Sequence, residues 1–120
     1  MTTITLTITG AYEGTVDASY TTVLTSDDIH IQVCLYLPEL EVANLMNNEF
    51  LYLSGIPPEI TPSSNLTFNI LTYDYEGEDP VKNPSYIIIK NNNTAGMCSQ
   101  GRPFQNATIG WVGCMLTWFV

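Results

Sequence analysis

The stretch from Ile109 to Val120, IGWVGCMLTWFV, is apolar almost throughout and constrains the fold more than any other segment of the chain. Side chains alternate between the two faces of a β-strand, and here both faces carry large apolar residues. The sequence therefore predicts a strand that is covered on both sides, with Trp111, Trp118 and Phe119 in the core. Such a segment is either the central strand of the fold or a segment that a partner covers.

A second strong signal lies near the start of the chain, where Ile4, Leu6 and Ile8 alternate with threonines. This period of two predicts a strand with one apolar face and an outer row of threonines. In a later strand the apolar phase switches at Ile70 and Leu71, which indicates either a β-bulge or a strand that passes from one packing layer to another. Alternating or apolar runs predict about seven strands, over residues 3–9, 16–24, 29–37, 50–53, 66–75, 86–89 and 107–120.

A short helix is expected over residues 39–48, because apolar residues from Val42 to Met46 recur at helical spacing and follow acids that suit a helix N-terminus. Residues 56–64 hold three prolines and are expected to form an extended loop. The segment Asn91–Pro103, with its glycines and asparagines, is expected to be a second loop.

The chain shows no internal repeat and no interdomain linker, so residues 1–120 are expected to form a single domain. Several short strands joined by turn-rich connections are typical of an antiparallel arrangement. The predicted fold class is therefore all-β: an antiparallel β-sandwich of jelly-roll-like type, with about seven strands and one short helix.

Charged residues make up only 12% of the chain, about half the usual share, so its surface must consist largely of uncharged polar residues. Such a surface is cheaper to desolvate, and charged residues are depleted at interface cores. All twelve acids lie between Glu13 and Asp79, and the three bases follow them. This order fits either an acidic soluble protein with few bases or a head-to-tail contact between the basic edge of one subunit and the acidic face of the next. A nucleic-acid partner is not expected, since no Lys/Arg cluster exists.

Two rows of side chains are interpreted as sheet surfaces open to pairing or covering: the threonines of the first strand, and the row of His30, Gln32, Cys34 and Tyr36. An edge with so few charges lacks the lysines that usually prevent edge-to-edge association. Contact with neighbouring subunits is further expected at the bases and in the second loop. The expected interface residues are Lys82, Lys90, Asn92, Arg102 and Phe104.

An acidic turn around Gly77 crowds four carboxylates into six residues. Oxygen ligands on a flexible loop are what Ca²⁺ accepts, although the twelve-residue EF-hand pattern is missing. The turn is therefore either a solvated acidic surface or a Ca²⁺ site, completed by a neighbouring subunit if need be. No other cofactor is expected. The candidate ligands are Asp74, Glu76, Glu78 and Asp79.

The sequence offers no catalytic set. Its single histidine, His30, has no Ser-His-Asp or Cys-His arrangement around it and is expected in mid-strand, so the protein is not expected to be an enzyme. Cys34, Cys98 and Cys114 lack the spacing of a zinc site. Free thiols are expected, with a Cys98–Cys114 bridge as the alternative in oxidising surroundings.

Neither a secretory leader nor an apolar run of about 20 residues is visible, so no membrane association is expected. In composition and architecture the chain is like the accessory and structural proteins of virus or phage particles. The leading hypothesis is a non-enzymatic structural subunit, a capsid decoration or cement protein made in the cytoplasm and located in the virion. It would bind its own copies, as a trimer for example, and a larger protein shell. The alternative is a β-sandwich module that binds carbohydrate or another small ligand.

Overall fold

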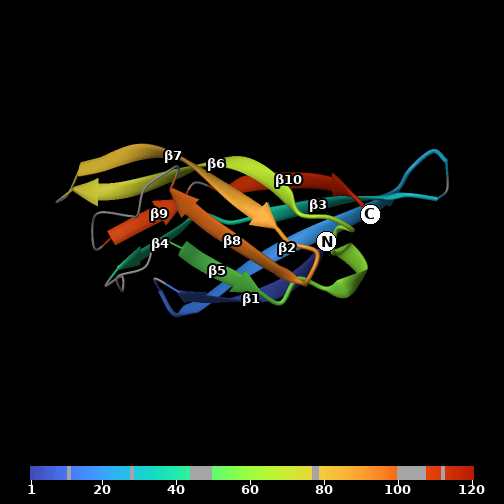
Figure 1. The fold of residues 1–120 in the computed structure, drawn as a ribbon, viewed down its shortest axis with the longest axis horizontal. Coiled ribbons are helices and arrows are strands. Elements are labelled where there is room, and N and C mark those ends of the chain that lie inside the picture. Colours follow the sequence, from blue (N-terminus) through green and yellow to red (C-terminus); the bar gives the residue numbers. More distant parts are fainter. Residues whose placement is uncertain (11, 28, 44–49, 77–78, 100–107, 112) are drawn as a thin grey trace.

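The computed structural model describes residues 1–120 except 11, 28, 44–49, 77–78, 100–107 and 112, and it describes side chains outside 41–50, 73–84 and 98–112. In the described part, the chain forms ten strands and one turn of 3-10 helix, η1, in a molecule of 51 × 25 × 22 Å (Figure 1). The elements are β1 (Thr2–Gly10), β2 (Gly14–Leu24), β3 (Ile31–Leu37), β4 (Leu40–Ala43), β5 (Phe50–Ser54), η1 (Pro58–Ile60), β6 (Leu66–Glu76), β7 (Asp79–Ile89), β8 (Thr94–Ser99), β9 (Thr108–Trp111) and β10 (Cys114–Phe119).

The strands pair in the order β10-β3-β2-β1-β5-β8-β7-β6-β9-β4, and all pairings are antiparallel. The two ends of this order are linked by the chain itself, because β4 follows β3 and β10 follows β9. The pairing register is the same on both sides of these links, because Leu37 pairs with Cys114 and Leu40 pairs with Trp111. The strand order therefore nearly closes on itself. The predicted antiparallel all-β class is confirmed, with ten strands instead of about seven.

β3 and β4 together act as one long strand with a break in it, and so do β9 and β10. The break in β3–β4 lies at Pro38 and Glu39, and Gly113 lies in the break of β9–β10. Proline has no N–H group and cannot donate to a ladder. A Cβ atom at Gly113 would lie 3.2 Å from the Tyr36 hydroxyl oxygen and 3.3 Å from the Glu39 backbone nitrogen. Glycine thus permits the close approach of the two chains at the break.

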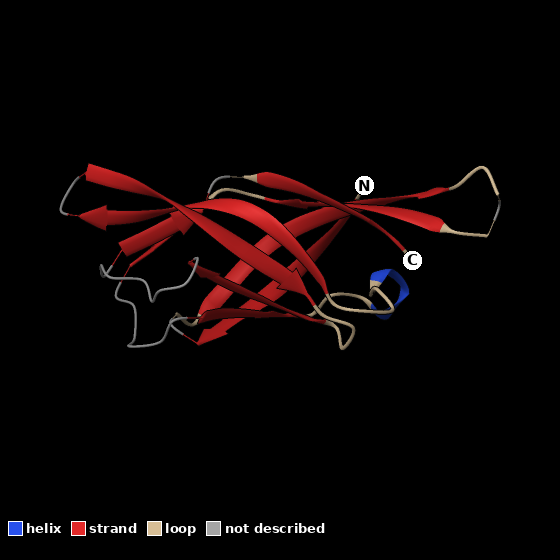
Figure 2. Cartoon of the chain, turned by 45° about the horizontal axis from the view of Figure 1, so that its top comes forward, coloured by secondary structure: helices blue, strands red, loops and turns tan. Residues whose placement is uncertain are grey.

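The core lies between two layers, β10-β3-β2-β1 and β5-β8-β7-β6, which Figure 2 shows curving around it. Every second residue of these strands points inward, as the alternation near the start of the chain predicts. The rings of Phe68 and Trp118 meet across the layers with centroids 6.2 Å apart. The buried core residues are Leu6, Ile8, Val16, Ala18, Val33, Leu35, Leu37, Leu51, Leu53, Ile56, Ile60, Ile70, Ile87, Ile89, Ala95, Met97, Leu116 and Trp118.

The helix predicted over residues 39–48 is wrong where the structure describes it. Leu40–Ala43 forms β4, and it pairs with β9 from Leu40↔Trp111 to Ala43↔Thr108. Residues 44–48 lie outside the described residues. A short segment has only a weak intrinsic preference for helix, and pairing with a neighbouring strand overrides it.

Two further local expectations are corrected. The segment Asn91–Pro103 is not one long loop, because Thr94–Ser99 forms β8 between β5 and β7. Its small residues and Gly96 give a weak strand signal in sequence. The bulge expected at Ile70 and Leu71 is also wrong, since β6 pairs with β7 residue by residue along its whole length. The alternative, a change of packing layer at this point, is wrong as well, because Ile70 and Thr72 both point inward. The apolar pattern in the sequence changes phase because Thr72 is buried and Leu71 is exposed.

The C-terminal stretch is also not a single strand buried on both faces. Trp118 is 3% exposed and lies in the core, whereas Phe119 is 61% exposed. The assignment of Phe119 to the core is therefore wrong, because only the inner face of β10 is covered. Trp111 lies in β9, and its side chain is outside the described part of the structure.

Candidate interaction surface

The outward side of the layer β10-β3-β2-β1 carries the side chains that alternate with the core residues. Cross-strand pairs align them in rows, one of which runs from Thr3 through Ser19 and Tyr36 to Met115. We call this surface the outer face. Its described residues are Thr3, Thr5, Thr7, Thr15, Asp17, Ser19, Thr21, Val23, Gln32, Cys34, Tyr36, Met115, Thr117 and Phe119.

Asp17 is the single charged residue among those that define the outer face. Large apolar side chains stand open to solvent on it, with Met115 57% and Val23 55% exposed. Thr5 donates a hydrogen bond of 3.0 Å to Asp17, and the Thr117 hydroxyl donates to the Cys34 sulfur at 3.8 Å. An apolar and hydroxyl-rich sheet surface of this kind can be covered by another protein at a small cost in desolvation.

A shallow depression lies next to the outer face, between the start of β6 and the end of β10. Its volume is about 380 Å³, and it is lined by Leu66, Thr67, Phe68, Thr117, Trp118 and Phe119. The indole of Trp118 forms part of its floor, and the indole N–H donates to the Ile60 carbonyl at 2.8 Å. The depression is mostly apolar, and among its aromatic rings Phe119 is the one exposed to solvent.

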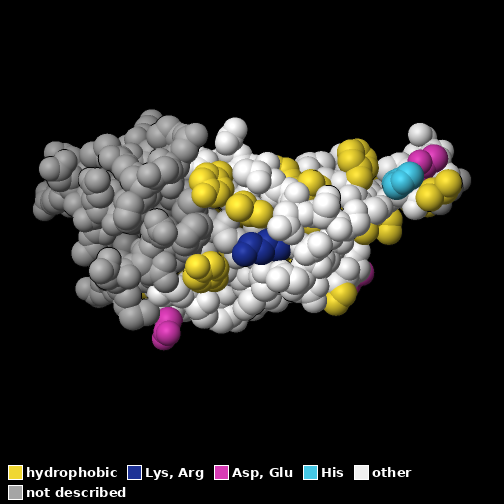
Figure 3. Space-filling view, viewed as in Figure 1, with side chains coloured by type: hydrophobic (Ala, Val, Ile, Leu, Met, Phe, Trp, Pro, Cys, Tyr) yellow, Lys and Arg dark blue, Asp and Glu magenta, His cyan; other side chains and the backbone are white. Residues whose placement is uncertain are grey.

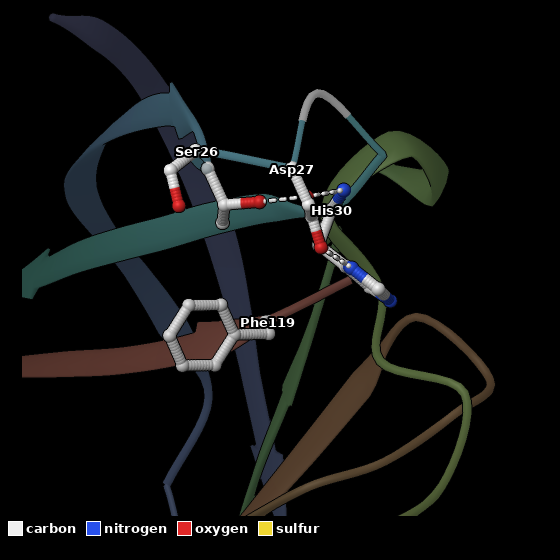
Figure 4. A pocket seen from close by; sticks show the side chains of 5 residues that line it. Ser26, Asp27, His30 and Phe119 are labelled. Atoms are coloured by element: carbon white, nitrogen blue, oxygen red, sulfur yellow. Dashed lines mark hydrogen bonds and ion pairs between the residues drawn. The ribbon is translucent and has the colours of Figure 1, made fainter.

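The turn between β2 and β3 projects from one end of the molecule, where Figure 3 shows its histidine beside an acidic side chain. Asp27 organises this turn (Figure 4): its carboxylate accepts hydrogen bonds from the Thr25 hydroxyl and from the backbone N–H groups of Ile29 and His30. Its second oxygen lies 2.7 Å from Nδ1 of His30. These hydrogen bonds, the one from Thr25 foremost, hold the pKa of Asp27 well below its usual range.

The geometry of this turn between β2 and β3 indicates a structural role. His30 lies directly before β3 instead of in mid-strand, and Ile29, which falls within the predicted strand 29–37, also precedes β3 and is 76% exposed. Ser26 and Phe119 also line the shallow pocket beside the turn, which has a volume of about 330 Å³. In Figure 4 the Ser26 hydroxyl points away from the His30 ring. The pair Asp27–His30 therefore fixes the turn and does not present an activated nucleophile.

The predicted Ca²⁺ ligands lie where β6 turns into β7. Glu76 pairs with Asp79, and Asp74 pairs with Val81, so the backbone brings these acids to one hairpin end. Glu78 and the side chains of the other three lie outside the described residues. Among the side chains that are described, no group of three or more His, Cys, Asp or Glu could hold a metal ion. The Ca²⁺ site stays a prediction.

The predicted interface residues are scattered. Lys90 and Asn92 share the turn between β7 and β8, on the far layer from the outer face, and the Lys90 N–H bonds the Thr94 carbonyl at 2.9 Å. Lys82 pairs with Tyr73 in the β6–β7 ladder, and its side chain is not described. Arg102 and Phe104 lie outside the described residues. The sequence patterns point to the bases and not to Met115 and Phe119, which are exposed because no second layer covers the outward side of β10.

Cys34 and Cys114 are free thiols, and burial raises the pKa of Cys114. The alternative Cys98–Cys114 bridge is therefore not formed. Within the described ranges, no helix has the length and apolar character needed to cross a membrane.

No protein-family model and no curated protein sequence matches the chain. Among solved structures, the fold is similar to that in a crystal structure of the reovirus attachment protein sigma1 in complex with α-2,3-sialyllactose. The TM-score is 0.59 at 9% sequence identity, and the match covers 97% of this chain and 62% of that chain. The chain thus spans less than two thirds of the sigma1 chain, and at this identity the likeness is one of fold. The β-rich fold described above is one that a viral attachment protein also has.

Proposed function

We propose that the protein is a non-enzymatic interaction subunit of a virus particle, which binds its own copies and a larger protein assembly. The observation that carries this proposal is the outer face, a broad sheet surface on which Asp17 is the single charge and large apolar side chains are exposed. Burying exposed apolar area contributes about 25 cal/mol per Å² to a complex, from which the entropy cost of association is subtracted. Few ionised groups need to lose their water in return.

The viral setting draws support from the fold. An attachment protein of reovirus has a similar arrangement of strands over nearly the whole of this chain. The proposal therefore favours a subunit at the surface of the particle, of the attachment or decoration type. The contacts among copies would then involve the outer face and not the scattered bases at Lys82, Lys90 and Arg102.

Native mass, measured by light scattering at low micromolar concentration, tests the proposal. The wild-type chain is expected to be an oligomer. Tyr36→Glu, which places a charge at the centre of the outer face, is expected to lower the mass, whereas Asn69→Glu on the exposed side of the other layer leaves it unchanged. A monomer at every concentration up to about 100 μM would contradict self-binding, since the binding free energy would then be weaker than about −5 kcal/mol.

The same measurement in EDTA tests the predicted Ca²⁺ site. Loss of mass or of thermal stability on chelation would support ligands at Asp74, Glu76, Glu78 and Asp79, because a bound ion stabilises the native state by mass action. An unchanged melting temperature in EDTA would remove the Ca²⁺ prediction without affecting the proposal of self-binding.

Carbohydrate binding is a second candidate, and the depression beside Phe119 favours it. Exposed aromatic rings next to hydroxyl groups suit the apolar faces of sugars, and the sigma1 structure is a complex with sialyllactose. Trp118 has too little exposed surface to act as the platform, so Phe119 is the ring expected to contact a sugar. Saturation-transfer NMR with α-2,3-sialyllactose, with lactose as the control, tests this. Carbohydrate binding at Phe119 is contradicted if Phe119→Ala gives the same saturation transfer to sialyllactose as wild type.

A further inference from the structure

The free edge of β10 has a backbone pattern that can be read from its pairing with β3. Ile31 and Val120 exchange both backbone hydrogen bonds, at 3.2 and 2.8 Å. Hydrogen-bonded and non-hydrogen-bonded pairs alternate along an antiparallel ladder. The N–H and C=O groups of residues 114, 116 and 118 therefore also point toward β3. Those of Met115, Thr117 and Phe119 point away from it, toward the open edge.

In the described part of the chain, no strand occupies that edge. β10 stands at one end of the strand order, and the neighbouring β6 pairs with β9 only from Thr72 to Asp74. The start of β6 and β10 are separated at the surface by the shallow depression that Thr117 and Phe119 line. Three successive edge positions of β10 thus present main-chain donors and acceptors to solvent.

This edge also lacks the features that usually prevent pairing with another chain. Protected edges carry lysine, proline or a bulge, whereas β10 reads CMLTWF without any of them. On the outward side of β10, Met115 and Phe119 flank Thr117 and are 57% and 61% exposed. The edge is therefore unpaired, uncharged and bordered by apolar side chains.

We propose that two copies of the chain pair along this edge, with β10 of one antiparallel to β10 of the other about a two-fold axis at Thr117. Thr117 then lies opposite Thr117 of the second copy, and Met115 lies opposite Phe119. All three pairs fall at positions whose N–H and C=O groups face the partner, so each exchanges both backbone hydrogen bonds. The inference rests on the self-binding of the proposed function and gives that binding a surface and a symmetry.

A second copy fits this edge because the register is self-complementary: an apolar residue stands two positions on either side of the central threonine, as an isologous contact requires. The net charge of −9 makes two copies repel each other over most of their surface. This repulsion is smallest at the β10 edge, because β10 and its neighbour β3 carry no charged residue. Pairing also joins the two outer faces into one continuous sheet surface.

The test uses the full chain with one substitution on the edge and a matched one on the other layer. Thr117→Lys puts two like charges opposite each other at the axis, and Ser54→Lys adds the same charge at an exposed position of β5, outside the outer face. Sedimentation velocity from 1 to 100 μM should show a dimer, or an even-numbered oligomer built from it, for wild type and Ser54→Lys. For Thr117→Lys the dissociation constant should rise at least tenfold.

A cross-link tests the register without relying on Thr117→Lys to fold. The background is Cys34→Ser, since Cys34 pairs with position 117 within one chain and would capture a new thiol there. In that background, Thr117→Cys should form an intermolecular disulfide on mild oxidation, because facing Cα atoms in such a pair lie about 5.5 Å apart. Ser54→Cys, on β5 of the other layer, should not form one in the same background.

The outcomes separate this inference from the function on which it rests. An oligomer that Thr117→Lys leaves intact, with no Thr117→Cys cross-link, overturns edge pairing and leaves self-binding standing. A wild-type monomer at 100 μM overturns both. Association of the monomer with an added extended peptide, and not with itself, would show that the edge serves another chain and would also overturn the two-fold pairing.

Discussion

The indole N–H of Trp118 donates a hydrogen bond of 2.8 Å to the backbone carbonyl of Ile60, and both residues are buried. This bond joins β10 to η1, a proline-rich turn far away in sequence that makes few backbone hydrogen bonds of its own. Figures 1 and 2 both show η1 close to the C-terminal end of β10. Trp118 therefore contributes a hydrogen bond to η1 as well as its apolar ring to the core.

Replacing Trp118 by Phe should destabilise the protein by about 1–3 kcal/mol, because the Ile60 carbonyl is left buried without its donor. The free energy of unfolding in urea measures the effect. Phe119→Leu is the control, since an exposed position should change stability by no more than about 0.5 kcal/mol. Equal losses of unfolding free energy in the two variants would show that the hydrogen bond does not contribute to stability.

Gly113→Ala should destabilise the fold by about 1–3 kcal/mol, because the new methyl group meets the Glu39 backbone nitrogen, which cannot move as a side chain can. Gly96→Ala in β8 is the matched control, as a Cβ atom there has no other atom within 4 Å. Thermal unfolding followed by circular dichroism compares the two. A tolerated alanine at position 113 would mean that the break between the linked strands relaxes freely.

Thr72 and Ser85 form a buried polar pair between β6 and β7, with their hydroxyl oxygens 2.5 Å apart. Thr72→Val should cost about 1 kcal/mol of stability through the loss of this hydrogen bond. The double variant Thr72→Val/Ser85→Ala should lose less than the sum of the single variants, with a coupling of at least about 0.5 kcal/mol. Urea unfolding of all four proteins completes the cycle, and strict additivity would refute the coupling.

The turn at Asp27 should keep its hydrogen bonds at pH values where an ordinary aspartate is already protonated. A carboxylate whose pKa is lowered in the folded state contributes stability above its unfolded pKa, and that stability is lost as the pH falls through the folded pKa. Because Asp27 is exposed, the expected effect is local: faster amide exchange at Ile29 and His30 at the lowest pH, measured by NMR. Thr25→Val removes the largest cause, so it should raise the pKa of Asp27 toward its usual value. An unchanged titration in that variant would show that the hydroxyl does not lower the pKa.

The parts of the fold that sequence predicts best are those where period-two alternation coincides with burial on one side. β1 is the clearest case, because Leu6 and Ile8 point inward and the threonines between them outward. The helix expected over residues 39–48 fails because so short a pattern fits either element, and its partner β9 lies far away in sequence. β8 was missed because Gly96 and its small neighbours carry little strand signal.

The proposed interaction surface is predictable in character but not in place. Low charge and the row of Gln32, Cys34 and Tyr36 pointed to an open sheet surface, and these side chains do lie on the outer face. The sequence could not show that only one face of β10 is covered, because a strand with apolar residues on both sides is typical of one that is covered on both faces. Phe119 is exposed because it points away from the core.

The pairing of β3 with β10 also bears on how the chain reaches its fold. Leu37 pairs with Cys114, and almost two thirds of the sequence lies between them. Contacts between such distant segments form only after a long loop has closed, which places folding in the range of milliseconds to seconds. During synthesis, β3 pairs with β2 early but has one bare side until β10 leaves the ribosome. In that interval the open edges of β3 in neighbouring nascent chains can pair with one another. The protein should therefore fold best when the local concentration of nascent chains is low.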